Sequence, residues 1–325
     1  MDRRRFLALA ATTALLAAGC RRWPGEPAED GAAGDTSRGD DRAGDTQRQQ
    51  PGIDRGHDTD GDGTHDADGS DRADGGADGG EPGDPPDDPD EPEPELDPDL
   101  LDAEPREWGE RVTGVRIRLD TDEPVIALTF DACGGTGGNG YDAQLIEHLR
   151  AAAVPATLFL NARWIEANPA TAGELADDEL FELANHGTEH RPISVTGREA
   201  YGIAGTASAQ AVVDEVLGCQ RLLTELDGTA PRHFRAGTAY GDEVAVAVVR
   251  DLGLEVVNFD VLGDAGATFS AVEVEQALLG ARPGSIALLH MNRPGSGTAE
   301  GVATAIPRLR DRGFAFTTLG NHRLA

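Results

Sequence analysis

Short, continuous runs of apolar residues recur through the second two thirds of the chain. They cover residues 125–130, 156–160, 254–259, 285–290 and 314–319. Their apolar residues follow one another without the polar alternation of a half-exposed strand, a pattern typical of strands that are buried on both faces of a parallel sheet. We therefore expect these five segments to form buried, parallel strands.

Helical periodicity separates several of these runs. Apolar residues spaced three and four apart predict helices over 141–153, 208–226 and 298–312. Strands that alternate with helices favour an α/β architecture, and the length from residue 106 to residue 325 suits one barrel-like domain. In such folds functional side chains gather where strands end, which draws attention to Asp131, to residues 258–264 and to His290.

The chain before this domain has a different composition. Residues 21–105 are rich in Asp, Glu, Gly and Pro and carry most of the net formal charge of −31, although 38% of the whole sequence is hydrophobic. Such a segment buries too little apolar surface to offset the entropy of ordering, so we expect a disordered acidic linker. The sequence contains no lysine. Phosphate binding needs clustered basic residues, which argues against nucleic acid as a partner.

Residues 1–20 have the layout of an export signal. A basic start precedes an apolar stretch and small residues before Cys20, and the stretch is too short to span a bilayer comfortably. The run at 3–7 resembles a twin-arginine motif, and 17–20 resembles a bacterial lipobox, although Ala17 stands where leucine is usual. We expect an exported lipoprotein, held on a membrane of the bacterial cell envelope by lipid on Cys20. The alternative is an ordinary cleaved signal.

Alternating carboxylates in the linker suggest a second, weaker possibility. Residues 58–71 place aspartates around Gly63 in a pattern that resembles calcium-binding loops. No helical pattern flanks this segment and no glutamate closes it, so a solvated acidic linker is the favoured interpretation.

Five short motifs follow one another along the domain, and in chain order they read LTFDAC, NHGTEH, FRAG, NFDVLGD and LLH. In order and approximate spacing they resemble the five motifs of the NodB-type polysaccharide deacetylases, carbohydrate esterase family 4, and the resemblance extends over about 125–320. It implies a distorted (β/α) barrel that hydrolyses N- or O-acetyl groups of sugars with a divalent metal ion, often zinc. The domain organisation is then a signal at 1–20, a linker at 21–105 and a deacetylase-like domain at 106–325.

The first motif departs from the family pattern, in which two consecutive aspartates serve as general base and metal ligand. Asp131 matches the base, whereas Ala132 replaces the ligand. A carboxylate at a strand end can take the proton of a water that attacks a carbonyl. The resemblance therefore assigns Asp131 as the catalytic base of a variant site.

The second motif supplies two imidazoles, His186 and His190, as metal ligands. Gly187 stands where serine or threonine is usual, and the segment is more typical of a loop than of a helix. Catalytic zinc sites generally have three protein ligands, so either the affinity for the metal falls or another group replaces the ligand lost at Ala132. Asp131 could turn toward the ion, while Asp142 is better explained as the cap of the following helix.

The other motifs supply the remaining catalytic candidates. Arg235 matches the arginine that orients the catalytic aspartate, and a guanidinium suits that task. Asp264 fits the fourth motif better than Asp260 and would raise the basicity of His290, which protonates the leaving group. Two further residues are assigned to substrate binding by the resemblance: Leu288, next to the acetyl methyl, and Tyr240, which lies later than the pattern requires.

Each of these residues has a structural alternative when it is taken alone. Asp131 could cap a turn, the histidine pair could be coincidental, and Arg235 could form a surface ion pair. Their common register favours the functional interpretation. For the cysteines, export permits a disulfide between Cys133 and Cys219. A catalytic cysteine is less favoured because no histidine is adjacent in the sequence.

The sequence thus predicts a metal-dependent hydrolase of carbon–nitrogen bonds. Its expected substrate is an acetylated envelope polysaccharide, such as peptidoglycan or another N-acetylhexosamine polymer, with O-acetyl ester hydrolysis also open. Two alternatives stay open: a glycan-binding pseudoenzyme, and a metal-independent hydrolase of C–N bonds in a small molecule.

Overall fold

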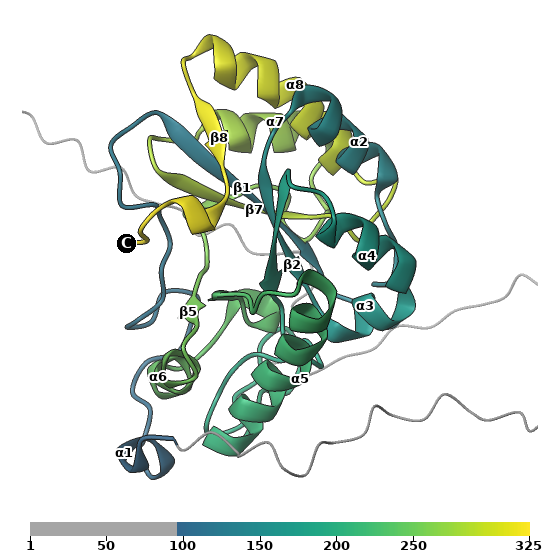
Figure 1. The fold of residues 1–325 in the computed structure, drawn as a ribbon. Helices are drawn as coiled ribbons and strands as arrows, with labels where there is room; N and C mark the ends of the chain where they lie inside the picture. Colours follow the sequence, from purple (N-terminus) through teal and green to yellow (C-terminus); the bar gives the residue numbers. More distant parts are fainter. Residues whose placement is uncertain (1–95) are drawn as a thin grey trace, which may run out of the picture. The chain divides into compact units, whose positions relative to one another are not determined.

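The computed structural model describes residues 96–325 (Figure 1). The predicted signal, the lipidation site Cys20, the acidic run at 58–71 and the linker up to residue 95 lie outside the described residues. Residues 96–105, which the sequence pattern assigns to the linker, instead contribute α1 (Pro98–Leu101) to the domain. Leu96 and Leu100 pack against one of the apolar clusters, which is why this acidic segment can be held in place.

The described residues form one sheet of eight strands, all of which pair in parallel. Seven of the strands follow the order β5-β4-β3-β2-β1-β7-β6, and the eighth, β8, also pairs with β1. The strands are β1 (Val125–Ala132), β2 (Ala156–Leu160), β3 (Phe181–Asn185), β4 (His233–Phe234), β5 (Glu255–Val256), β6 (Val261–Leu262), β7 (Ser285–His290) and β8 (Ala315–Thr317). The predicted α/β architecture with a parallel sheet is confirmed.

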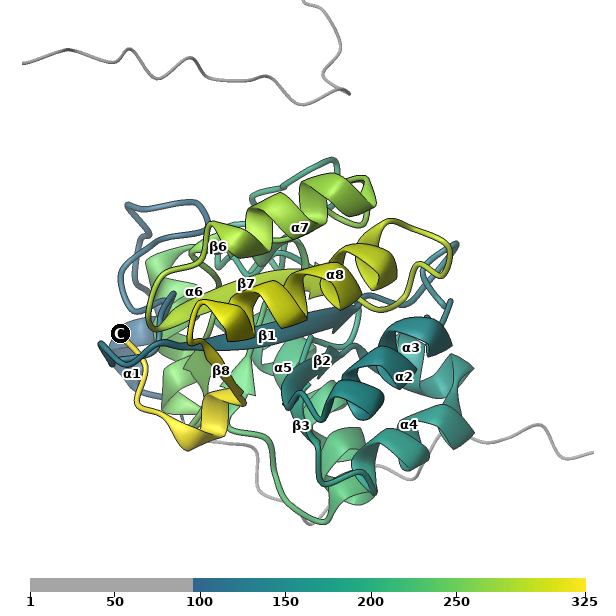
Figure 2. The same ribbon diagram turned by 90° about the horizontal axis from the view of Figure 1, so that it is seen from above.

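Helices follow most of the strands and lie around the outside of the curled sheet (Figures 1 and 2). After α1 they are α2 (Ala143–Ala152), α3 (Ala162–Ala167), α4 (Pro169–Ala176), α5 (Ala209–Asp227), α6 (Glu243–Asp251), α7 (Ala271–Leu279) and α8 (Thr298–Asp311). None of the helices within 96–325 is long and apolar enough to cross a membrane. The three helices that the sequence predicts correspond to α2, α5 and α8.

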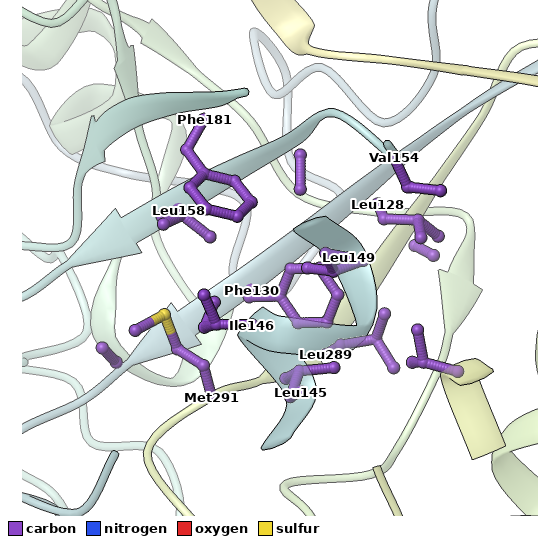
Figure 3. Packing of buried hydrophobic residues seen from close by; sticks show 14 of the residues in the cluster. Leu128, Phe130, Leu145, Ile146, Leu149, Val154, Leu158, Phe181, Leu289 and Met291 are labelled. Carbon is purple, nitrogen blue, oxygen red and sulfur yellow. The ribbon is translucent and has the colours of Figure 1, made fainter. Parts of the chain in front are cut away.

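The two faces of the central strands pack against different surroundings. In β1, the fully buried Leu128, Phe130 and Ala132 belong to a cluster that includes residues of α2 and β7, part of which Figure 3 shows. The alternate residue Ala127 belongs to a separate cluster, which also contains Phe159 of β2 and Leu288 of β7. Because successive side chains of a strand point to opposite faces, one face of the sheet meets the helices and the other lines the inside of the curl.

The segment before β1 spans the open side of the sheet. Arg116 forms a bridge with Val257 just after β5, and Arg118 forms one with Ser285 at the start of β7. This segment therefore connects the β5 edge of the sheet with its central strands.

Candidate active site

The candidate catalytic residues follow the carboxyl ends of neighbouring strands. Asp131 near the end of β1 is directly in register with His290 at the end of β7. His186 comes after β3 and Arg235 after β4, where the Arg235 amide donates to the Asn185 carbonyl. Parallel strands bring all their carboxyl ends to one edge of the sheet, so residues more than a hundred positions apart meet there.

Asp131 is held by a fully buried arginine. Arg235 Nη1 donates to Asp131 Oδ1 at 2.6 Å, and Nη2 donates to Thr129 Oγ1 at 3.0 Å. The guanidinium also lies 4.0 Å from the centroid of the Phe159 ring, on the inner face of the sheet. The contact is a single hydrogen bond and not the bidentate clamp that the guanidinium shape suggests, because the rest of the fork binds Thr129 and two backbone carbonyls.

The fully buried Asp264 and the partly buried His290 form a second pair. Asp264 Oδ1 lies 2.8 Å from His290 Nδ1, and the Oδ2 atom accepts from the His290 amide at 2.7 Å and from Thr298 Oγ1 at 2.9 Å. Burial alone would lower the pKa of His290, but the Asp264 carboxylate outweighs it and holds that pKa well above its ordinary value. Asp260, the other candidate in this motif, binds Ser285 and the Ile286 amide instead.

His186 and His190 face each other across a tight loop. Their ring centroids are 4.8 Å apart and the ring planes are almost perpendicular. The His186 Nδ1 atom lies 2.9 Å from the Arg235 carbonyl, which fixes the tautomer and leaves Nε2 facing Asp131 Oδ2 at 3.5 Å. His190 has a left-handed backbone with φ of 60°, a strained conformation that is common at functional sites.

Cys133 lies beside these imidazoles, which the sequence did not reveal. Its Sγ atom is 3.8 Å from His186 Nε2, and the imidazoles of His190 and His290 also lower its pKa. Burial would raise the pKa of the thiol, but the three imidazoles outweigh it and hold that pKa well below its ordinary value. The reasoning from sequence that no histidine adjoins Cys133 therefore fails in three dimensions.

The ligand atoms of three side chains lie within reach of one ion. One atom each from Cys133, His186 and His190 lie within 4.8 Å of one another. A carbonyl already occupies Nδ1 of His186, so its Nε2 lone pair is free for a metal, as is usual for histidine ligands. Nitrogen and sulfur donors suit zinc and similar ions. The residues present therefore fit a divalent ion.

Two buried side chains support the loop that contains the two histidines. Glu215 of α5 accepts from the Glu189 and Arg191 amides, each at 3.0 Å, and so holds both neighbours of His190. Asn161 donates to the His186 and Gly187 carbonyls. A Cβ atom on Gly187, where φ is +79°, would lie 2.3 Å from Glu215 Oε1, so the departure from the usual serine or threonine follows from this packing.

The loop that follows Cys133 also requires glycine. Gly134 has φ of +69°, and a Cβ atom there would lie 2.7 Å from the Trp164 amide nitrogen of α3. This close packing fixes the chain direction one residue beyond Cys133. The glycines at 137 and 140 line a hollow together with residues 292–296, next to the end of β7.

The remaining predicted residues lie at different distances from this cluster. Leu288 is on the inner face of β7, two positions before His290, and is 7% exposed. The Tyr240 ring packs against Trp108 and Tyr201, so its side chain belongs to an aromatic group that the sequence motifs did not include. Asp142 caps α2 through the Leu145 amide, as expected. The proposed disulfide is not formed, because Cys219 is a free, buried thiol that donates to the Leu160 carbonyl.

Comparisons with known proteins bear on this arrangement. Residues 118–257 match the family model of the polysaccharide deacetylases. The chitooligosaccharide deacetylase of Sinorhizobium fredii is 27% identical to this chain over 216 residues, which cover 62% of the chain and 93% of that protein.

Two other matches to this chain differ in character. The uncharacterised protein YlxY of Bacillus subtilis is 23% identical over 202 residues, covering 61% of the chain but only 57% of that protein. The crystal structure of a family 4 pseudoenzyme from Bacillus anthracis matches with a TM-score of 0.55 at 22% identity, over 64% of this chain and 68% of that one. The structural match confirms the predicted distorted (β/α) barrel of the NodB type.

Proposed function

We propose that this protein is a metal-dependent deacetylase that removes acetyl groups from an envelope glycan, peptidoglycan or another polymer of N-acetylhexosamine. The observation that carries the proposal is the meeting of three groups at one edge of the sheet: the Asp131–Arg235 pair, the His290–Asp264 pair and the imidazoles of His186 and His190. The match to the deacetylase family model and to the chitooligosaccharide deacetylase supports the reaction and the class of substrate.

The chain's own residues divide the work of the hydrolysis. Asp131 takes the proton of the attacking water, and Arg235 holds its carboxylate in place. His290, protonated and held by Asp264, donates a proton to the departing amine or alcohol. Leu288 and the backbone around Tyr240 contact the acetylated sugar.

The proposed cofactor is a divalent ion, with zinc favoured by the nitrogen donors of His186 and His190. When bound, such an ion polarises the acetyl carbonyl as a Lewis acid. The two imidazoles belong to one loop, whose backbone forms hydrogen bonds with the side chains of Glu215 and Asn161. This support keeps the donors in place before an ion arrives.

Acetate release from acetylated hexosamine oligomers tests the proposal. We expect the full chain, supplied with zinc, to release acetate from such oligomers. The rates of acetate release from chitin fragments, peptidoglycan fragments and O-acetylated glycans then rank these substrates. A chain that binds an ion but releases no acetate from any of these glycans would favour the glycan-binding pseudoenzyme. Release that is unaffected by chelators would favour metal-independent hydrolysis.

A change at Asp264 is expected to alter the pH dependence of the reaction. The carboxylate raises the pKa of His290, so the imidazolium survives to a pH above its ordinary range, and activity falls as the pH rises through that value. Asp264→Asn removes this charge, lowers the pKa of His290 and moves the alkaline limb of the kcat profile to lower pH. A profile of unchanged shape, with only a lower plateau, would contradict the assigned role.

Export and anchoring remain part of the proposal. The motif around Cys20 is the sole support for a lipid anchor, and the acidic linker would then separate the domain from the membrane. Radioactive palmitate is expected to label the protein in a bacterial host, and Cys20→Ala is expected to abolish the label. Label that persists in this variant would exclude anchoring at Cys20.

A further inference from the structure

We propose that Cys133 is the third protein ligand of the metal ion and takes, as a thiolate, the place that Ala132 cannot fill. This inference rests on the proposed function for the existence of the metal site, but it does not require that the site turn over. The protein ligands are then two imidazole nitrogens and one thiolate sulfur, whereas the family pattern has two imidazole nitrogens and a carboxylate. The ion that fits best is then a thiophilic one.

The alternation of β1 explains why position 133, and not position 132, supplies the ligand. Ala132 is fully buried in the cluster on the helix-facing side, together with Phe130 and Leu128. Asp131 and Thr129 lie on the inner face of the sheet, where Arg235 donates hydrogen bonds to both. Cys133 is the next position in this alternation, and its Sγ atom does lie 3.8 Å from His186 Nε2.

The other candidates for a third ligand have partners of their own. Asp131 Oδ2 faces His186 Nε2 at 3.5 Å, but Oδ1 accepts from Arg235 at 2.6 Å, and the carboxylate is not part of the group whose ligand atoms lie within 4.8 Å of one another. Asp142 caps α2. With Cys133 as ligand, Asp131 keeps its carboxylate for the proton of water, so the metal and the base need not share one group.

Replacing a carboxylate ligand by a thiolate affects both proton release and the choice of metal. The thiol loses its proton to solvent as the sulfur–metal bond forms, so ion binding releases that proton without an oxidant or reductant. Thiolate and imidazole suit zinc and cobalt, whereas carboxylate and water suit magnesium and manganese. We therefore expect a strong preference for zinc over manganese.

Cobalt spectroscopy tests the inference directly, because a sulfur–cobalt bond produces a near-ultraviolet charge-transfer band that imidazole and carboxylate ligands do not. The full chain, reduced and loaded with one equivalent of Co²⁺, is expected to show this band. Cys133→Ala should abolish it and weaken zinc binding by at least about 100-fold, since changes in outer-shell partners alone cost 10- to 100-fold. Cys20→Ser and Cys219→Ser are the matched cysteine controls, and both should keep the band.

A second measurement covers a Cys133→Ala protein that fails to fold. In the unaltered chain, bound zinc should slow the alkylation of Cys133 by iodoacetamide. Mass spectrometry of the peptide that contains Cys133 measures the extent of alkylation. Cobalt that binds with no charge-transfer band, or alkylation that zinc does not slow, would overturn the inference. Either result leaves the proposed function intact, because that is judged by acetate release, whereas a sulfur band without acetate release would overturn only the function.

Discussion

Asp131→Asn is expected to lower the rate of acetate release by about 10²- to 10⁴-fold, the usual contribution of a general base. The asparagine has nearly the same shape, and its oxygen can still accept the hydrogen bond from Arg235 that the carboxylate accepts at 2.6 Å. What it cannot do is take a proton from water. The loss should therefore fall on kcat, with a smaller effect on KM.

A neighbouring carboxylate provides the matched control for this prediction. Asp142 is also buried, lies in the segment between the same strand and α2, and accepts from the Leu145 amide as the helix cap. Asparagine is as good a cap as aspartate, so Asp142→Asn should leave both folding and acetate release close to those of the parent. If Asp131→Asn also kept its activity within a few-fold, Asp131 would not be the base.

Five of the eight strands, including the two that contain Asp131 and His290, could be predicted from the sequence, whereas β3, β4 and β6 could not. Continuous apolar runs identified β1, β2 and β7, and the carboxyl ends of β1 and β7 placed Asp131 and His290 at one edge. By contrast, β4 and β6 contain two residues each. Such short strands carry no periodicity, and only their pairing with neighbours defines them.

The assignment of faces was the step that needed the structure. A run that is apolar throughout does not show which residues face the helices and which line the inside of the curl. The motif comparison found the ligand lost at Ala132, but it could not show that Ala132 faces the helices and that Cys133 lies beside His186. Applying strand alternation from Asp131 would have suggested Cys133.

Glu215 had no signal in the sequence that set it apart. It falls within the predicted helix at 208–226, where the sequence pattern does not distinguish it from the exposed charged residues of that helix. In the structure it is 4% exposed, and burial raises the pKa of its carboxyl although two backbone amides donate to it. Its importance comes from a loop that is distant in the sequence, which no local pattern records.

Arg235→Met is expected to destabilise the domain by about 3–5 kcal/mol, the usual cost of leaving one member of a buried ion pair without its partner. Arg235 is fully buried, and its hydrogen bonds join Asp131, Thr129 and two backbone carbonyls across several strands. Methionine keeps much of the length of the side chain but leaves the Asp131 carboxylate buried without an ion-pair partner. Unfolding in urea, followed by circular dichroism, measures the loss.

Two further variants separate the buried charge from lost packing. Arg308 and Glu275 form an ion pair of the same 2.6 Å length, but the Arg308 side chain is 57% exposed. Arg308→Met should therefore cost only roughly 0–1 kcal/mol, because solvent screens such pairs. Asp131→Asn added to Arg235→Met removes the stranded charge and should recover part of the stability. If the double variant were no more stable than Arg235→Met, the cost would lie in the packing of the guanidinium against Phe159 and the strand ends, and not in the buried carboxylate.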